Sequence, residues 1–238
     1  MKLFRNNRKK LIKKQGFLKY LAYAFGEIFL VVIGILIAVY LNNWNEDQKD
    51  AKELSNILFI VQKDLKNDID EAKEVIFSEK SKEKLYNQFF EEELTSKDYQ
   101  ENIRARRLIF GFKEISFDKR GFNLLKDYKN NVEISKDILI SNIIELYSDR
   151  LEEVKADDKL RNLDFELNYN FWKTQSWWSN YIREKKSDAF IKYALTSQDY
   201  KNRVASWHFI TFKAFIPELE QFILDAEKIY KQIESRRQ

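Results

Sequence analysis

The sequence predicts an all-α protein: one N-terminal transmembrane helix, a long helix after it, and an extracytoplasmic helical bundle. Residues 20–41 form an apolar run with a single charge, which is the composition of a membrane-spanning helix. A basic cluster precedes the run, and polar residues end it at once. The rest of the chain spaces its apolar residues as helices do, and only residues 110–117 are ambiguous between helix and strand.

The N-terminal segment, residues 1–19, accounts for the basic character of the chain. It holds eight lysines and arginines and no acidic residue, whereas residues 20–238 hold four more acidic than basic residues. The positive-inside rule therefore predicts a cytoplasmic location for this segment. A nucleic-acid-binding protein carries its basic surface on the folded domain, so we expect no nucleic-acid partner.

The apolar run, residues 20–41, is long enough to cross a membrane. As a helix its 22 residues span about 33 Å, against a hydrocarbon core of about 30 Å. Aromatic residues of the kind found at membrane interfaces flank both ends: Tyr20, Tyr23, Tyr40 and Trp44. We therefore expect an uncleaved, single-pass signal-anchor with a cytoplasmic N-terminus, and a domain over residues 42–238 that lies outside the cytoplasm.

Two other interpretations of the run compete with the anchor. The stretch 28–41 has the length of a signal-peptide core, but Ala38, Val39 and Tyr40 form a poor cleavage site. The second interpretation is a buried core helix, and the all-round apolar surface and the flanking charge asymmetry argue against it.

Small residues form one stripe of the predicted span: Ala22, Gly26, Gly34 and Ala38. Small residues four positions apart let two helix backbones approach closely, so the stripe predicts helix packing and self-association. The alternative is that such pairs arise by chance, because small residues are common in membrane helices.

Glu27 is the single charged residue of the span. An ionised carboxylate in the hydrocarbon is costly unless it is protonated, paired or hydrated. One role is a proton or ion site, and the other is a neutral hydrogen-bonding partner of a neighbouring helix or of Tyr23. The structural role is favoured, because no second ionisable group lies deeper in the span to relay a proton.

The segment over residues 16–47 resembles a known family. It contains GEI, LVVIGILIA and NNWNE in that order, and this pattern is similar to the N-terminal signature of an uncharacterised bacterial family of single-pass membrane proteins, DUF6090-like. A weaker similarity covers residues 118–148, where the turn at 129–133 lacks the expected glycine. The resemblance implies membrane anchorage and a helical outer domain, and hence a bacterial inner (cytoplasmic) membrane with residues 42–238 on the periplasmic side. It implies no activity, substrate or catalytic residue.

The outer part begins with a long helix predicted over residues 46–92. Its apolar residues follow a spacing that resembles a coiled-coil seam, interrupted by Asp68: Leu54, Leu58, Val61, Leu65, Ala72 and Val75. An ordinary amphipathic helix of a bundle is the favoured alternative.

Further helices are predicted over residues 96–110, 118–129, 135–164, 166–186 and 197–235, with a short one at 188–194. Two of them open on a hydroxyl residue followed three positions later by an acid, which is a capping-box pattern: Thr95 with Asp98, and Thr196 with Asp199. Pro217 falls inside the last helix and predicts a kink or a new helix start.

Motifs for chemistry are nearly absent from the sequence. The chain has no cysteine and one histidine, His208, which excludes thiolate zinc sites and multi-histidine metal centres. His208 lies in an apolar run, which is typical of a core or interface residue. Carboxylate runs such as Glu152–Glu153 are typical of solvated helix faces. We therefore expect no catalytic, cofactor-binding or metal-binding residues.

Aromatic residues crowd residues 165–181, which include three of the five tryptophans. One helix cannot turn all of them to one side. Two interpretations follow: a candidate outer contact patch for a glycan or a protein partner, or a helix buried on several sides of the bundle, which is favoured. The candidate patch comprises Trp172, Trp177, Trp178 and Tyr181.

Together these observations favour a membrane-anchored, non-enzymatic interaction module: a scaffold, a sensor-like domain or an accessory subunit of an envelope complex. The expected partners are the lipid bilayer and either a second copy of the chain or another membrane protein, and the ligand is unknown. The alternative is an energy-coupling or transport accessory subunit that uses Glu27. An envelope hydrolase with a carboxylate pair ranks third.

Overall fold

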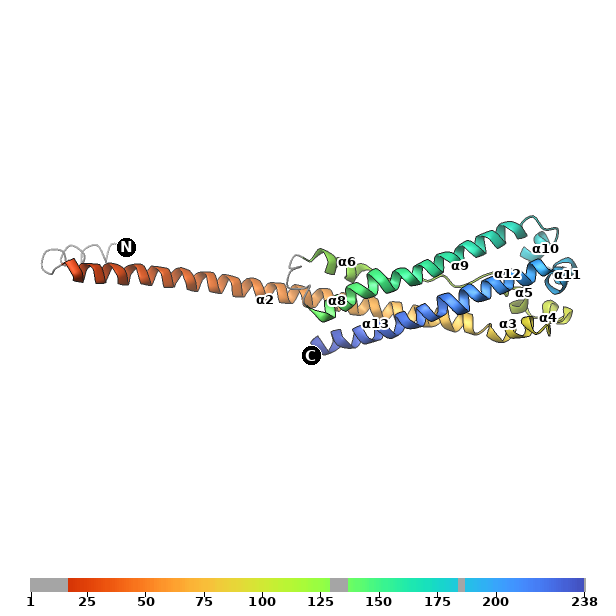
Figure 1. Cartoon of the computed structure of the whole chain (residues 1–238), viewed down its shortest axis with the longest axis horizontal. Helices are drawn as coiled ribbons and strands as arrows, with labels where there is room; N and C mark the ends of the chain where they lie inside the picture. Colours follow the sequence, from red (N-terminus) through yellow and green to blue (C-terminus); the bar gives the residue numbers. More distant parts are fainter. Residues whose placement is uncertain (1–16, 129–136, 184–186, 238) are drawn as a thin grey trace. The chain divides into compact units, whose positions relative to one another are not determined.

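The computed structural model describes residues 17–128, 137–183 and 187–237 (Figure 1). These residues form helices and no strand, so the predicted all-α class is confirmed. Most of the basic segment and the predicted turn at 129–133 lie outside the described residues. The chain divides into two compact units, residues 1–55 and residues 56–238.

Helix α2 (Phe17–Lys80) supplies the described part of the first unit. Nearly all large apolar side chains between Phe25 and Leu41 are exposed, and water solvates such a surface poorly. Among the described helices, α2 alone is long and apolar enough to cross a membrane. This part of the chain is therefore compatible with a single-pass membrane protein.

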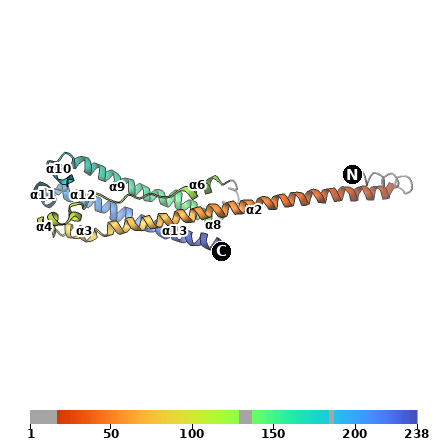
Figure 2. The same ribbon diagram turned by 180° about the vertical axis from the view of Figure 1, so that it is seen from behind.

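Three long helical stretches form the second unit. The first is the part of α2 after residue 55. The second runs without a break through α8 (Ile138–Glu145), the π-helical η1 (Leu146–Arg150) and α9 (Leu151–Trp172). The third runs through α12 (Gln198–Phe209), the π-helical η2 (Ile210–Phe215) and α13 (Ile216–Arg237). Figures 1 and 2 show the three stretches side by side.

Contacts between the stretches set their directions. The second stretch runs parallel to α2, and the third runs antiparallel to it. Four pairs show this: Asp68–Tyr147 and Glu79–Arg161 between α2 and the second stretch, and Lys73–Glu227 and Lys80–Glu220 between α2 and α13.

The apolar face of α2 packs into the core of this bundle. Apart from Leu54, each residue of the predicted seam is at most 1% exposed: Leu58, Val61, Leu65, Ala72 and Val75. The bundle-helix interpretation of the seam therefore holds. Asp68, which interrupts the seam, is buried as well at 2% exposure.

An extended segment, residues 110–119, follows the short helices and returns along α2; we call it the strap. No strand pairs with it in the described part of the chain, and carboxylates of α2 accept its backbone N–H groups instead. The N–H of Ser116 donates to Glu71 Oε1 (3.1 Å), and the N–H of Asp118 donates to Asp68 Oδ1 (2.7 Å). The stretch that the sequence leaves ambiguous is therefore neither helix nor strand.

Helix α6 (Arg120–Asp127) follows the strap and lies against α2. The N–H of Gly121 donates to Asp64 Oδ2 (2.7 Å). A Cβ at Gly121 would come within 2.5 Å of the backbone N of Val61, so only glycine permits this approach without a shift.

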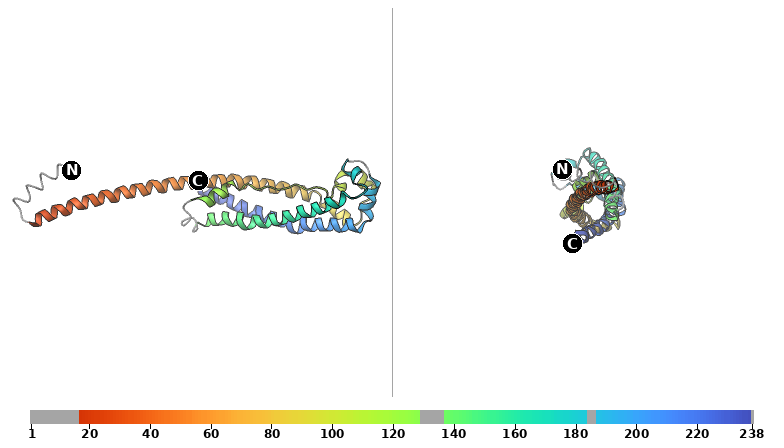
Figure 3. Two further views of the ribbon diagram at one scale, coloured as in Figure 1. Left: turned by 90° about the horizontal axis from the view of Figure 1, so that it is seen from above. Right: turned by 90° about the vertical axis from the view of Figure 1, so that its left-hand side faces the viewer.

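Short helices gather at one end of the second unit (Figure 3): α3 (Glu83–Phe90), α4 (Ser96–Glu101), α5 (Ile103–Arg106), α10 (Trp178–Ile182) and α11 (Asp188–Thr196). The capping box predicted at the start of α4 is confirmed, because the N–H of Thr95 donates to Asp98 Oδ2 (2.8 Å) and the N–H of Asp98 donates to Thr95 Oγ1 (3.4 Å). The capping box predicted at Thr196 is wrong, because α11 ends there and Asp199 binds Arg203 instead.

Other helix boundaries differ from prediction where tertiary contacts set them. Helix α5 ends at Arg106 rather than at residue 110, since the following residues enter the strap. Helix α9 continues through the predicted break near residue 165, where Asp164 accepts a hydrogen bond from Ser206. Pro217 is the second residue of α13, and the helical backbone continues into it from η2, with Ile216 at φ −62° and ψ −46°. The predicted new helix start is therefore wrong, and the π-helical η2 lies directly before the proline-containing turn.

Candidate functional site

The residues predicted to matter in the span lie on α2, in the first unit. A Cβ at Gly26 or Gly34 would meet nothing within 4 Å, and Ala22 and Ala38 are exposed. The stripe is therefore accessible along its length. Glu27 is partly exposed. Self-association through the stripe and the role of Glu27 stay predictions.

The aromatic patch predicted on the outer surface is mostly core. Trp172 (0% exposed) and Trp177 (4% exposed) are buried, so the outer-patch interpretation is wrong for these two, and the buried interpretation holds. Both pack on Phe110 of the strap, at ring-centroid distances of 3.7 Å and 6.3 Å. Trp178 and Tyr181 are partly buried and stack on each other at 5.8 Å.

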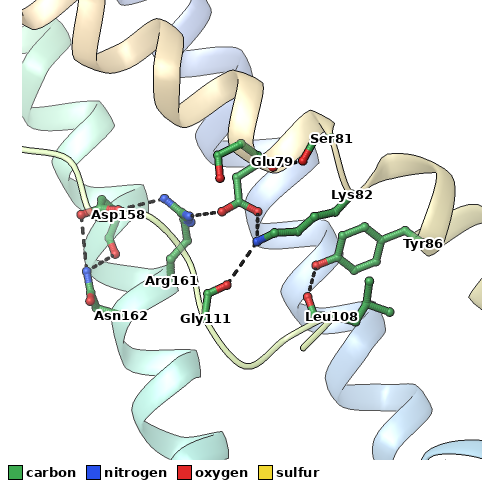
Figure 4. Close-up of polar contacts among 10 residues, drawn as sticks. Glu79, Ser81, Lys82, Tyr86, Leu108, Gly111, Asp158, Arg161 and Asn162 are labelled. Atoms are coloured by element: carbon green, nitrogen blue, oxygen red, sulfur yellow. Dashed lines mark hydrogen bonds and ion pairs between the residues drawn. The ribbon is translucent and has the colours of Figure 1, made fainter. Parts of the chain in front are cut away.

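A buried charged network joins α2, α9 and the strap, and it is the candidate functional site. Arg161 and Glu79 are 0% exposed. Arg161 donates through Nη2 to Glu79 Oε1 (3.4 Å) and through Nη1 to Asp158 Oδ1 (3.0 Å). Lys82 Nζ donates to Glu79 Oε2 (3.0 Å) and to the carbonyl oxygen of Gly111 in the strap (3.2 Å), as Figure 4 shows.

Aromatic rings enclose the guanidinium of Arg161. Its Cζ lies 4.0 Å from the ring centroid of Phe215, 4.8 Å from that of Phe112 and 5.6 Å from that of Trp207. Cation–π attraction is strongest at such water-poor sites. Burial lowers the pKa of Arg161 and raises the pKa of Asp158, because desolvation penalises the charged form of each.

The network holds the strap in register. Two cations and two carboxylates balance its charge, which reduces the cost of burying them. Next to the network, Tyr86 Oη donates to the carbonyl oxygen of Leu108 (2.7 Å), just before the strap begins. The charged groups of the network bind one another and the backbone of the strap. This arrangement holds the strap in place and does not present a reactive group.

A second polar cluster lies further along the strap. Asp68 accepts hydrogen bonds from the N–H of Asp118 and from Tyr147 Oη (3.2 Å). Burial raises the pKa of Asp68 to about 7, and the neighbouring carboxylates of Asp118 and Asp64 act in the same direction. This carboxyl therefore binds a proton near neutral pH.

Sequence reasoning missed both clusters. A signal was present for the second: Asp64, Asp68 and Glu71 recur on the apolar face of the predicted long helix, where unpaired acids are rare. No signal marked Arg161, which follows a run of charged residues. His208 was expected in the core or an interface, and it is partly buried, with its ring 4.8 Å from that of Phe212. In the described ranges, no group of three or more potential metal ligands gathers.

Comparison with known proteins bears on the N-terminal part of the chain. The model of a family of unknown function, DUF6090, matches residues 27–111. The predicted resemblance is confirmed over that range, which runs from Glu27 to the start of the strap. The weaker resemblance at 118–148 lies outside the matched residues and stays a prediction. No curated protein and no solved structure matches the chain.

Proposed function

We propose that the protein is a membrane-anchored, non-enzymatic interaction module of the bacterial inner membrane, with its helical domain on the periplasmic side. The observation that carries this proposal is the exposed apolar segment of α2 between Phe25 and Leu41, which is what a lipid-facing helix presents. The helical bundle of residues 56–238 is the part that meets a partner. The eight basic residues among residues 1–19 support the proposed orientation.

A reporter fused after Gln238 tests the orientation. Alkaline phosphatase is active only outside the cytoplasm. Green fluorescent protein is fluorescent in the cytoplasm, and it does not become fluorescent when it is exported in unfolded form. We expect phosphatase activity and no fluorescence from the two fusions. The opposite pattern would overturn the proposed topology.

The partner in the membrane is a second copy of the chain or another membrane protein. The stripe supports this proposal, because Gly26 and Gly34 leave open space where a partner backbone can approach. Cross-linking in native membranes measures the association. We expect Gly34→Leu to reduce the cross-linked species severalfold. Val32→Leu is the matched control, since residue 32 lies on the opposite side of the helix and its side chain is exposed.

Glu27→Gln separates the two proposed uses of the intramembrane carboxylate. Glutamine cannot carry a proton. If Glu27 is a packing contact, affinity purification of the variant recovers less of the partners than the wild type does. Retained partners together with a lost proton or ion flux would favour the energy-coupling alternative instead.

A further inference from the structure

A pocket of about 460 Å³ lies beside the buried network, where the strap passes the end of α2. Phe110, Gly111 and Phe112 of the strap line it, together with the last turn of α2 and helix α5. This volume falls within the range of about 300–1,000 Å³ that small-molecule sites occupy.

The ionisable side chains that line this pocket are all basic: Lys82, Arg104, Arg107 and Lys113. Carboxylates outside the lining, Glu79 and Glu74, pair with the two lysines and partly neutralise them. Arg104 lies in α5 and Arg107 directly follows this helix, and both residues belong to the lining. A pocket of about 390 Å³ between η1 and α13 differs in kind, because four acidic and two basic residues line it.

The position of Lys82 is fixed before any ligand binds. Lys82 Nζ is held by Glu79 Oε2 (3.0 Å) and by the carbonyl oxygen of Gly111 (3.2 Å), and both bonds are drawn in Figure 4. The ring of Phe110 is packed against Trp172 on the core side. Groups that are ordered in the free protein lose little conformational freedom on binding, which favours affinity.

The donors suit a phosphate group. Guanidinium groups bind the oxygens of phosphate in a bidentate manner. Ser78 and Ser81 also line the pocket, and the hydroxyl of Ser81 donates to the carbonyl oxygen of Ser78 (2.7 Å). A phosphate monoester offers three terminal oxygens and close to two negative charges, whereas a carboxylate offers two oxygens and one charge. Ile103 and the two strap phenylalanines supply an apolar surface for the organic part.

We propose that this pocket binds a small phosphate monoester, with the phosphate on the basic side chains and the organic part against the strap phenylalanines. The phosphate belongs either to a free molecule or to the headgroup of a lipid. This inference deepens the proposed function, since it names the ligand that the interaction module recognises. It does not depend on the oligomeric state of the chain.

Isothermal titration calorimetry tests the inference on the full-length chain in phosphatidylcholine nanodiscs, with phenyl phosphate as the probe. We expect saturable binding that Arg104→Gln weakens about tenfold or more, because one charge-assisted contact is lost. Arg183→Gln is the matched control, since Arg183 is an exposed arginine outside the pocket, and it should bind as the wild type does. Unchanged melting curves would verify that both variants fold.

Three results would overturn the inference: no binding of phenyl phosphate, equal binding of benzoate, or equal affinity in Arg104→Gln and the wild type. Nanodiscs that contain phosphatidic acid distinguish the two sources. If phosphatidic acid in the nanodisc competes with phenyl phosphate for the pocket, the natural phosphate belongs to a lipid headgroup. If it does not compete, the phosphate belongs to a free molecule. Binding by a chain that fails to cross-link would contradict the proposed self-association and leave the pocket assignment standing.

Discussion

Replacement of Gly121 by alanine tests how closely α6 approaches α2. A Cβ at this position would lie 2.5 Å from the backbone N of Val61 and 2.7 Å from its Cα. Backbone atoms cannot rotate aside as a side chain can, so α6 must shift outward. Overpacking of this kind costs about 1–3 kcal/mol. The buried hydrogen bond from the N–H of Gly121 to Asp64 Oδ2 is weakened as well, which costs about 1 kcal/mol more.

The better helix propensity of alanine offsets about 1 kcal/mol of this cost. We therefore expect Gly121→Ala to lower the free energy of unfolding by about 2 kcal/mol. Urea unfolding of the full chain in detergent, followed by tryptophan fluorescence, measures the change. Gly111→Ala is the matched control, because a Cβ there meets nothing within 4 Å, and its effect should stay within about 0.5 kcal/mol. Equal stability of the two variants would refute the close approach.

Three further predictions concern the buried polar and aromatic groups. Arg161→Met leaves the buried Glu79 without one of its cations, and we expect urea unfolding to show a loss of about 3 kcal/mol; a loss below about 1 kcal/mol would contradict the burial of this ion pair. The pKa of Asp68 is about 7 in the folded state and near 3.8 in the unfolded chain. The proton on Asp68 therefore stabilises the fold fully below pH 3.8, and this stabilisation disappears as the pH rises to about 7. Thermal unfolding at about pH 5 and about pH 8 should therefore show a smaller decrease of the melting temperature in Asp68→Asn than in the wild type, and parallel pH profiles would argue against the raised pKa. Trp172→Ala should cost about 3–5 kcal/mol and Trp178→Ala clearly less, because the first side chain is buried and the second is partly exposed; similar losses on urea unfolding would contradict that difference.

The helical class and most helix positions could be predicted from the sequence, because they depend on local patterns. The apolar spacing of α2 indicated its buried face, and Thr95 with Asp98 indicated the start of α4. Pro217 indicated an irregularity for an equally local reason, since proline disrupts the interior of a helix, and the π-helical η2 ends two residues before it.

The strap could not be predicted, because its partners are far away in the sequence. The N–H of Ser116 donates to Glu71, and the N–H of Asp118 donates to Asp68. A pattern of apolar and polar residues contains no information about such pairings. The burial of Trp172 has the same origin, since the ring that covers it belongs to Phe110 of the strap. Without the strap, part of the aromatic cluster would have to be exposed, which is what the outer-patch interpretation assumed.

The strap also explains why the perturbed carboxyl of Asp68 is a poor catalytic candidate. A raised pKa in a buried carboxyl often marks an active site. Here each oxygen of Asp68 already accepts a hydrogen bond, one from the N–H of Asp118 and one from Tyr147 Oη. A general base needs an oxygen that can reach a proton of the substrate, whereas these two oxygens satisfy groups of the fold. The hydrogen bond from the N–H of Asp118 to the buried carboxyl therefore helps to hold the strap in position, and the strap in turn lines the basic pocket.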